Sequence, residues 1–432
     1  MATFTGNWAD ETYSGGSGND TINGGGGSDT LNGGGGNDTV CEEVWTEDSH
    51  TFTGTAILHG DAGNDRLFVD FDGPALDIER GTFKLYGDAG NDRLEATYYY
   101  PWSEGPNYGA AKDFLYGGTG DDTYVLQQHT DAVIEKAGEG YDTVIGWGDD
   151  YTLPANVEKL QLEYGVDDAP SGYHGTGNTL ANTIVGTQAD DTLDGAAGND
   201  TLYGKPLGEN WDWNEDADTI HGGTGNDLIY GAGGDNDTWD GDDLLYGDDG
   251  NDRIFGSYGD DQMYGGTGAD ELGGQAGNDT MYGGSGNDKL GGGSGNDWLY
   301  GEGDADVLSG RGDLDHLSGG PGNDIFDYDA VTDSKGAARD VILDFAGAGA
   351  AAGDRIDLST IDANTTAGGN QAFKFVGTAA FSGPGQVRVA ASGADTLIQV
   401  NTDANKATVE MDILVKDGAA TPTQWVAGDF IL

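Results

Sequence analysis

The residues best suited to chemistry in this sequence are aspartates that recur every nine positions. From Gly247 to Asp327 each nine-residue repeat begins with glycine and carries aspartate at its sixth position. Carboxylates in such strict register, joined by the carbonyl groups of glycine-rich turns, are hard oxygen ligands that favour Ca²⁺ over Zn²⁺ or Mg²⁺. The candidate ligands in this array are Asp252, Asp261, Asp270, Asp279, Asp288, Asp297, Asp306, Asp315 and Asp324.

Further copies of the repeat occur earlier in the chain. Three tandem copies fill residues 15–41, and other copies begin at Gly60 and Gly87, three repeat lengths apart, so we interpret the residues between them as decayed repeats. Turns that lack the aspartate, such as those containing Ala56 or Pro74, are expected to bind no calcium. The aspartates of the earlier copies, which we also predict to bind calcium, are Asp20, Asp29, Asp38, Asp65, Asp92, Asp122, Asp191, Asp200 and Asp227.

Each repeat predicts a turn followed by a very short strand. Its six glycine-rich residues suit a tight turn, because glycine reaches positive φ freely, and the other three suit a minimal strand. The middle residue of that strand points to one face, and it is always apolar in the long array, as in Met263, Leu290 and Phe326. Stacked repeats would bury these residues between two parallel sheets. The predicted fold class is therefore all-β, a β-solenoid.

The charge balance also requires a cationic partner. The chain has 18 Lys and Arg against 77 Asp and Glu, a net charge of −59, and it contains 80 glycines. Such a composition opposes compact folding unless cations offset the repulsion. Nucleic acids and anionic membrane surfaces are excluded as partners, because both are attracted by clusters of Lys and Arg that this chain lacks.

Targeting signals and cysteines set further bounds. No stretch approaches the ~20 apolar residues of a membrane-spanning helix, so no membrane insertion is expected. Residues 1–7 lack the basic start and apolar run of a cleaved signal peptide, so the chain either stays in the cytosol or carries an export address elsewhere. The single cysteine, Cys41, rules out an intrachain disulfide and is expected to be a half-buried small residue.

The repeat at residues 283–291, with the sequence GGSGNDKLG, resembles the calcium-binding nonapeptide of the RTX family. That resemblance implies a right-handed parallel β-roll in which two repeats form one coil. It also implies that calcium ions lie between turns two repeats apart, so that Asp252 pairs with Asp270 and Asp261 with Asp279. The long array would then contain seven such positions between turns.

The C-terminal part has a second resemblance, to the C-terminal domain of serralysin-type secreted proteases. It rests on residues 322–326 (GNDIF), 340–345 (DVILDF), 354–358 (DRIDL) and 429–432 (DFIL). The resemblance implies a β-sandwich-like cap and an uncleaved C-terminal signal read by a type I secretion machinery. It thus implies an extracellular or cell-surface protein of a Gram-negative bacterium. Independently, alternation in 396–400 and 408–415 predicts a hairpin.

Four domains are expected on these grounds. They are an N-terminal roll with decayed repeats (1–116), an irregular β-solenoid segment (117–185), the main roll (186–327) and the cap with the secretion signal (328–432).

No catalytic constellation is found in the sequence. The zinc motif H-E-x-x-H of the serralysin proteases is absent, so calcium binding and export are carried over and proteolysis is not. The histidines have neither metal-ligand spacing nor a neighbouring nucleophile; they are His50, His59, His129, His174, His221 and His316. We therefore expect no enzymatic activity.

Three functions remain open after these exclusions. The first is a secreted, non-enzymatic protein that folds on calcium outside the cell and acts in a surface layer, a matrix or adhesion, with self-association as one form. The second is a calcium-dependent carbohydrate binder that uses aromatic residues at 98–108 and 211–213, although packing over a coil edge would also explain these rings. The third is a polysaccharide epimerase or lyase, which the lack of a long repeat-free segment disfavours.

Overall fold

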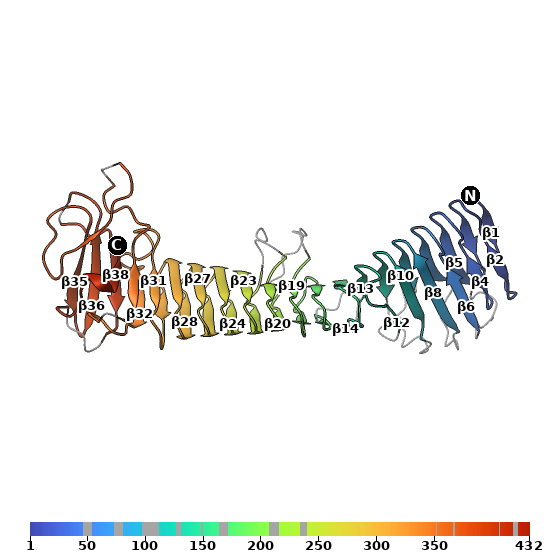
Figure 1. The fold of residues 1–432 in the computed structure, drawn as a ribbon, viewed down its shortest axis with the longest axis horizontal. Helices are drawn as coiled ribbons and strands as arrows, with labels where there is room; N and C mark the ends of the chain where they lie inside the picture. The colour runs from blue at the N-terminus through green and yellow to red at the C-terminus, as the bar shows by residue number, and fades with distance from the viewer. Residues whose placement is uncertain are drawn as a thin grey trace. The chain divides into compact units, whose positions relative to one another are not determined.

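The structure is a computed structural model of the chain (Figure 1), and it forms two compact units, Met1–Asp200 and Thr201–Leu432. The residues described are 1–45, 54–72, 81–96, 112–126, 131–147, 150–163, 172–206, 216–233, 240–350, 352–365, 368–405, 407–417 and 422–432. They contain no helix with the length and apolar composition needed to span a bilayer.

The first unit is built almost entirely from short parallel strands. One sheet contains β1 (Thr3–Thr5), β3 (Thr21–Asn23), β5 (Thr39–Trp45), β7 (Arg66–Asp72), β9 (Arg93–Ala96), β11 (Thr123–Leu126), β13 (Thr143–Trp147), β15 (Lys159–Glu163) and β17 (Thr183–Val185). The alternate strands are β2 (Thr12–Ser14), β4 (Thr30–Asn32), β6 (Thr55–His59), β8 (Thr82–Ala89), β10 (Phe114–Thr119) and β12 (Ala132–Val133), followed by β14 (Tyr151–Thr152), β16 (His174–Thr176) and β18 (Thr192–Asp194).

The second unit repeats this plan. One sheet contains β19 (Thr201–Tyr203), β21 (Leu228–Tyr230), β23 (Arg253–Tyr258), β25 (Glu271–Ala276), β27 (Lys289–Ser294), β29 (Val307–Gly312), β31 (Ile325–Asp327), β33 (Arg355–Asp357) and β38 (Phe430–Ile431). The other contains β20 (Thr219–Thr224), β22 (Leu244–Asp249), β24 (Gln262–Thr267), β26 (Thr280–Ser285), β28 (Trp298–Gly303), β30 (His316–Ser318), β32 (Val341–Asp344), β37 (Met411–Val415), β36 (Asp395–Asn401), β35 (Gln386–Ser392) and β34 (Lys374–Phe375).

Each coil of the long array contains two repeats, as predicted. Strands two elements apart pair in parallel, so that Leu245 lies beside Met263 and Ile254 beside Leu272, in each case one pair of repeats further along. The eighth-position residues are buried in a continuous file between the two sheets: Ile254, Met263, Leu272, Met281, Leu290, Leu299, Leu308, Leu317 and Phe326. The β-roll predicted from the sequence is confirmed.

The strands of the long array are longer than the three residues expected. From β22 to β29 each strand has six residues, because pairing continues into the second and third positions of the next repeat. Gly266 pairs with Gly284 and Thr267 with Ser285. Successive coils have the same length there, so the first half of every turn also stacks in register.

Coils in the first unit have unequal lengths. Leu67 pairs with Leu94, three repeat lengths on, yet that single coil contains two strands rather than three within the described residues. Residues 73–80, among them Pro74, lie outside the described residues. Further along, Tyr124, Val144 and Leu160 stack in turn, so parallel strands continue into the segment expected to be an irregular β-solenoid.

The C-terminal strands extend the roll and then reverse direction. β36 and β37 form the predicted antiparallel hairpin, with Thr396 opposite Val415, and β35 adds to it antiparallel. Two strands join this cap to the roll in parallel, β37 beside β32 and β38 beside β33. The short 3₁₀ helix η1 (Ala427–Asp429) leads into β38.

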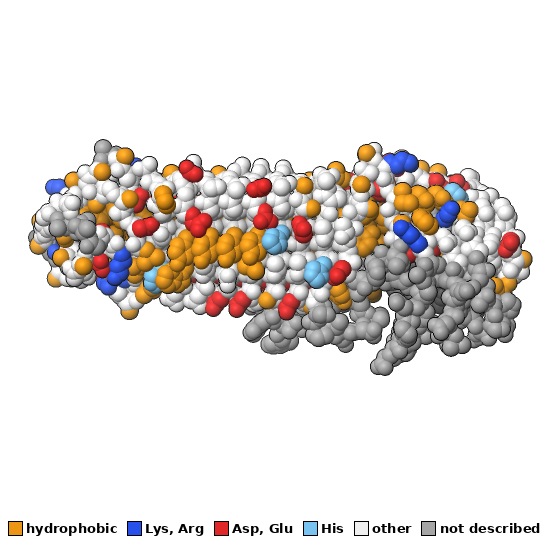
Figure 2. Space-filling model, turned by 90° about the horizontal axis from the view of Figure 1, so that it is seen from below, with side chains coloured by type: hydrophobic (Ala, Val, Ile, Leu, Met, Phe, Trp, Pro, Cys, Tyr) orange, Lys and Arg blue, Asp and Glu red, His pale blue; other side chains and the backbone are white. Residues whose placement is uncertain are grey.

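Parallel register also stacks aromatic rings on the outer face of the second unit. Tyr246, Tyr264, Tyr282 and Tyr300 occupy the ninth position of alternate repeats, with successive ring centroids 4.9, 4.9 and 5.0 Å apart and nearly parallel planes. Figure 2 shows a continuous hydrophobic stripe along one face of the molecule. Identical rings meet because neighbouring parallel strands lie ~4.8 Å apart.

We expect Tyr282→Ala to weaken the roll without changing calcium binding. Tyr282 stacks on two rings, and each aromatic pair contributes about 0.5–1.5 kcal/mol beyond burial, so the free energy of unfolding should fall by about 1–3 kcal/mol. Urea denaturation at saturating calcium measures it. Tyr258→Ala, at an exposed ring, is the control; equal losses in the two variants would show that stacking adds nothing.

Candidate calcium-binding turns

All the aspartates predicted as ligands lie in turns that enter a strand, and all are buried. Their exposed fractions are at most 4%, which is unusual for a charged side chain. The turns place them because each aspartate stands two residues before the buried apolar residue of its strand, as Asp288 stands before Leu290. The fold therefore brings a file of carboxylates to the edge of each sheet.

Successive aspartates along one edge are in direct contact. One oxygen of each carboxylate, Oδ1, accepts a hydrogen bond from the backbone N–H of the aspartate two repeats earlier, at 2.8 Å for Asp252 to Asp270 and 3.0 Å for Asp261 to Asp279. All seven pairs expected in the long array make this contact, the remaining five being Asp270–Asp288, Asp279–Asp297, Asp288–Asp306, Asp297–Asp315 and Asp306–Asp324.

The second oxygen, Oδ2, has no hydrogen-bond partner in any of the nine turns of the long array. An ionised carboxylate buried without a partner costs several kcal/mol. The same feature recurs in the first unit at Asp38, Asp65, Asp92 and Asp122. The donor set thus leaves one buried anionic oxygen per turn available for a cation.

A glycine at the first position of each repeat leaves room for that cation. A Cβ placed on Gly283 would lie 2.6 Å from Oδ2 of Asp288 and 2.8 Å from the carbonyl oxygen of Gly301 in the next coil. The φ of Gly283 is not positive, so the position requires glycine for space rather than for backbone freedom. A carboxylate and a carbonyl oxygen that converge on one small space fit the oxygen cage that Ca²⁺ prefers.

The electrostatics of the metal-free turns are unfavourable to ionised aspartate. Burial raises the pKa of Asp261 to about 8 and the pKa values of Asp252 and Asp306 to about 7; neighbouring carboxylates add to the increase, and the backbone N–H bonds only partly oppose it. A divalent cation between the turns would reverse this preference, because it stabilises the charged form.

The files contain aspartates that the sequence reasoning missed. Asp315 donates its N–H to Asp340 and Asp324 donates to Asp354, both at 3.1 Å, so the files run into the cap. Others of this kind are Asp113, Asp142, Asp218 and Asp243. Each of them stands two residues before a buried apolar residue, and this aspartate spacing without its glycines would have found them.

At one turn a lysine side chain, that of Lys205, pairs with the buried carboxylates. The Nζ atom of Lys205 lies 2.6 Å from Asp216 and 3.0 Å from Asp240, and all three side chains are buried. Burial alone would lower the pKa of Lys205, but the two carboxylates outweigh it and hold that pKa above the usual lysine value. Lys205 follows the first-position glycine of its repeat, so its ammonium group neutralises carboxylates at a turn edge.

The turn with Ala56 carries no carboxylate, as expected. Ala56 pairs with Phe83, and the backbone N–H of Phe83 donates to Asp113 at 2.9 Å, so two apolar residues interrupt this file between Asp29 and Asp113. The absence of calcium from that turn stays a prediction.

Four of the six histidines make structural contacts. His59 pairs with Asp88, His221 with Asp248 and His174 with Asp150, while His316 stacks on Trp298. His50 and His129 lie outside the described residues, as do both aromatic segments. Cys41 is buried rather than half-buried, and burial raises the pKa of its thiol to about 12, which makes it unreactive.

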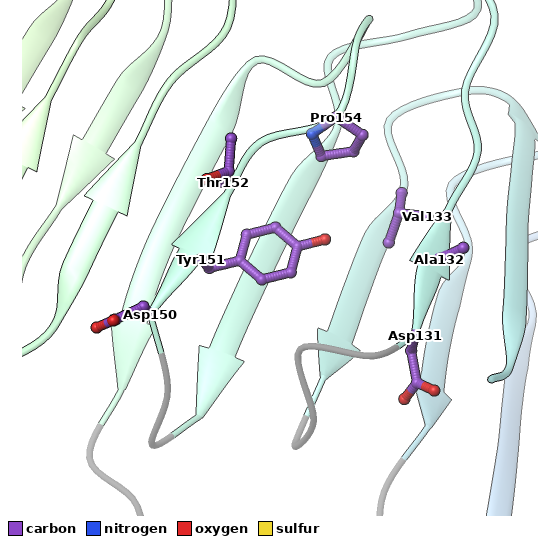
Figure 3. A pocket seen from close by; sticks show the side chains of 7 residues that line it. All are labelled: Asp131, Ala132, Val133, Asp150, Tyr151, Thr152 and Pro154. Carbon is purple, nitrogen blue, oxygen red and sulfur yellow. The ribbon is translucent and has the colours of Figure 1, made fainter. Parts of the chain in front are cut away.

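A hollow lies on the first unit. It is lined by Asp131, Ala132, Val133, Asp150, Tyr151, Thr152 and Pro154, and in Figure 3 the Tyr151 ring extends from β14 toward Val133 of β12. Burial raises the pKa of Tyr151, which disfavours its use as a proton donor near neutral pH.

We expect Gly283→Ala to weaken calcium binding and Gly291→Ala to leave it unchanged. The new methyl group at position 283 would occupy the space between Asp288 and Gly301 and cost about 1–3 kcal/mol of strain. At Gly291 a Cβ meets only a carbonyl oxygen at 3.9 Å, so this variant is the matched control. Calorimetric titration with calcium measures the difference. Equal isotherms would contradict a cation in that space.

Without calcium, the roll should be more stable at pH 5 than at pH 7.5. The folded pKa values of about 6 to 8 exceed the unfolded aspartate value of about 3.9, so the stabilisation from protonation is complete below that value and is lost as the pH rises through the folded values. Circular dichroism in a chelator should show more β structure at pH 5. More structure at pH 7.5 would show that these carboxylates are not buried uncompensated.

Comparisons with known proteins agree with this geometry. The family model "RTX calcium-binding nonapeptide repeat (4 copies)" matches residues 5–40, 50–72, 84–97, 109–125, 176–205 and 214–239. The model "Peptidase M10 serralysin C terminal" matches residues 245–432, and no protease domain matches.

One curated relative also shares part of the sequence. A stretch of 79 residues is 39% identical to the endo-1,3-1,4-beta-glycanase ExsH of Rhizobium meliloti (strain 1021), which covers 18% of this chain and 16% of that protein. The ranges that the two family models match, between residue 5 and the C-terminus, agree with the aspartate files and the glycine-lined spaces. The chain therefore carries RTX calcium-binding nonapeptide repeats and a serralysin C-terminal domain.

Proposed function

We propose that this protein is exported unfolded by a type I secretion machinery and folds on calcium outside the cell, where it acts as a non-enzymatic surface, matrix or adhesion protein. The observation that carries the proposal is the file of buried aspartates with unpartnered Oδ2 atoms. A chain of net charge −59 that buries such groups needs cations to fold.

Calcium concentration supplies the switch between the two states. Extracellular calcium modules bind with Kd values of about 10⁻⁴ to 10⁻³ M, so low cytosolic calcium leaves their sites empty. Metal binding that requires the folded site adds its free energy to folding. The chain then stays expanded during passage through a narrow channel and collapses on release.

The C-terminal strand supports the order of these events. Residues 429–432, which resemble the export signal, are part of the folded domain: Phe430 is buried and pairs with Ile356, and Asp429 accepts hydrogen bonds from Gly349 and Val426. A signal held in this way is accessible to a transporter only before the domain folds.

A second candidate is calcium-dependent polysaccharide binding. The partial match to a glycanase favours it. The stacked tyrosines of the second unit do not, because their faces contact one another and leave edges toward solvent. This function therefore depends on 98–108 and 211–213. A glycan array with Trp102→Ala and Trp213→Ala tests it, and turnover of alginate or pectin-like polymers tests the epimerase or lyase alternative.

We expect calcium to convert the chelated protein from an expanded chain to β structure near the millimolar range. Circular dichroism and light scattering during one calcium titration measure folding and assembly together. A folding transition without growth indicates a monomeric extracellular protein, and growth into large particles indicates a surface layer or matrix. Identical cooperative β structure with and without calcium would overturn the proposal.

A further inference from the structure

A glutamate replaces a turn glycine in a segment that neither family model matches. Residues 126–175 lie between the matched ranges 109–125 and 176–205. Phe114 and Leu115 of β10 pair with Ala132 and Val133 of β12, and the N–H of Ile134 donates to Leu115. Continuing this register places Glu135 beside Gly117, where regular coils have the first-position glycine of the next repeat.

The backbone carbonyl group of Glu135 does not face the glycine of the preceding coil, as it would in a regular turn. In a regular turn the carbonyl oxygen at this place faces the glycine of the preceding coil, as that of Gly117 faces Gly87. The carbonyl oxygen of Glu135 instead accepts a hydrogen bond from Asn156 at 2.9 Å. A Cβ on Gly117 would collide with the Glu135 carboxylate and with Oδ2 of Asp122. The side chain has therefore taken the place of the missing carbonyl group.

Three carboxylates converge at this point. One oxygen from each of Asp122, Glu135 and Asp142 lies within 4.8 Å of the others, and all three side chains are buried. The Tyr124 hydroxyl donates to Glu135, and Asp142 accepts the N–H of Asp122 at 2.8 Å, so the cluster is held from both sides.

The cluster also contains unpartnered oxygens. Oδ2 of Asp122 and Oδ2 of Asp142 are buried with no hydrogen-bond partner, although both residues are at most 1% exposed. The Lys136 side chain is exposed and pairs with Glu139, so it does not neutralise the cluster. Within the described part of the chain no cationic side chain pairs with these three carboxylates, so a bound cation would offset their charge when they are ionised.

The same substitution occurs once more in the first unit. Asn23 pairs with Cys41, so Glu42 stands beside the first-position glycine Gly24. A Cβ on Gly24 would collide with Glu42 and Asp29, whose Oε2 and Oδ2 atoms are buried and unpartnered. A glutamate of the next coil therefore lies beside a first-position glycine in two turns, Glu42 beside Gly24 and Glu135 beside Gly117.

We propose that Asp122, Glu135 and Asp142 form a three-carboxylate site for a hard divalent cation, with Ca²⁺ as the expected ion. Tyr124 and Asn156 are positioning residues that orient Glu135. Regular turns offer one aspartate from each of two coils, and the glutamate adds one more negative charge. Since affinity for Ca²⁺ rises with the number of charged ligands, this site should fill before the regular ones.

The test is calcium binding by Glu135→Gln, with Glu139→Gln as the matched control. Glu139 lies in the same turn and loses the same charge, but it pairs with exposed Lys136. In calorimetric titration at pH 7.5 we expect Glu135→Gln to lose the tightest step or weaken it by at least about tenfold. Glu139→Gln should match the wild type. Equal isotherms for Glu135→Gln and the wild type would overturn the site.

A measurement on the unaltered protein keeps the proposal falsifiable if Glu135→Gln fails to fold. In crystals soaked in terbium, which replaces Ca²⁺, anomalous scattering should place a peak between Gly117, Glu135 and Asp142. Peaks at the regular turns with none at this point would overturn the site. Both experiments use purified protein, so they stand or fall independently of the proposed role outside the cell.

Discussion

Repulsion among buried aspartates is the constraint on which the rest of this structure depends. Parallel coils stack ~4.8 Å apart, so a carboxylate that repeats once per coil must lie close to its copy in the next coil. One oxygen is satisfied by the backbone N–H of the preceding aspartate, and the other is left buried without a partner. The fold and the calcium requirement therefore have the same origin.

The composition follows from this constraint. The first-position glycines leave space between a carboxylate and a carbonyl oxygen, whereas others, such as Gly286, adopt the positive φ that the turn requires. The apolar eighth position supplies a thin core one side chain wide. Such a core stabilises each coil only weakly, which makes folding sensitive to the ions in the turns.

Two kinds of departure from the repeat change the negative charge of a turn in opposite directions. Lys205 places a tethered ammonium group between Asp216 and Asp240, so that turn carries its own cation. Glu42 and Glu135 do the opposite and add a negative charge to a turn that is already acidic. The chain thus combines turns that need no ion, turns of ordinary design and turns of higher negative charge.

The strict nine-residue period by itself determined the stacked parallel strands and the core residues. Alternation in 396–400 and 408–415 determined the hairpin, and the resemblance of the repeat to the RTX nonapeptide implied two repeats per coil. The sequence could not show that strands extend to six residues, since that depends on how the turns of neighbouring coils stack. It also missed Asp142, Asp340 and Asp354, whose turns keep only some of the repeat glycines. Only the tertiary structure set Glu135 beside Gly117 and Lys205 between two distant aspartates. Register between coils of unequal length is fixed by packing and not by the spacing of residues along the chain.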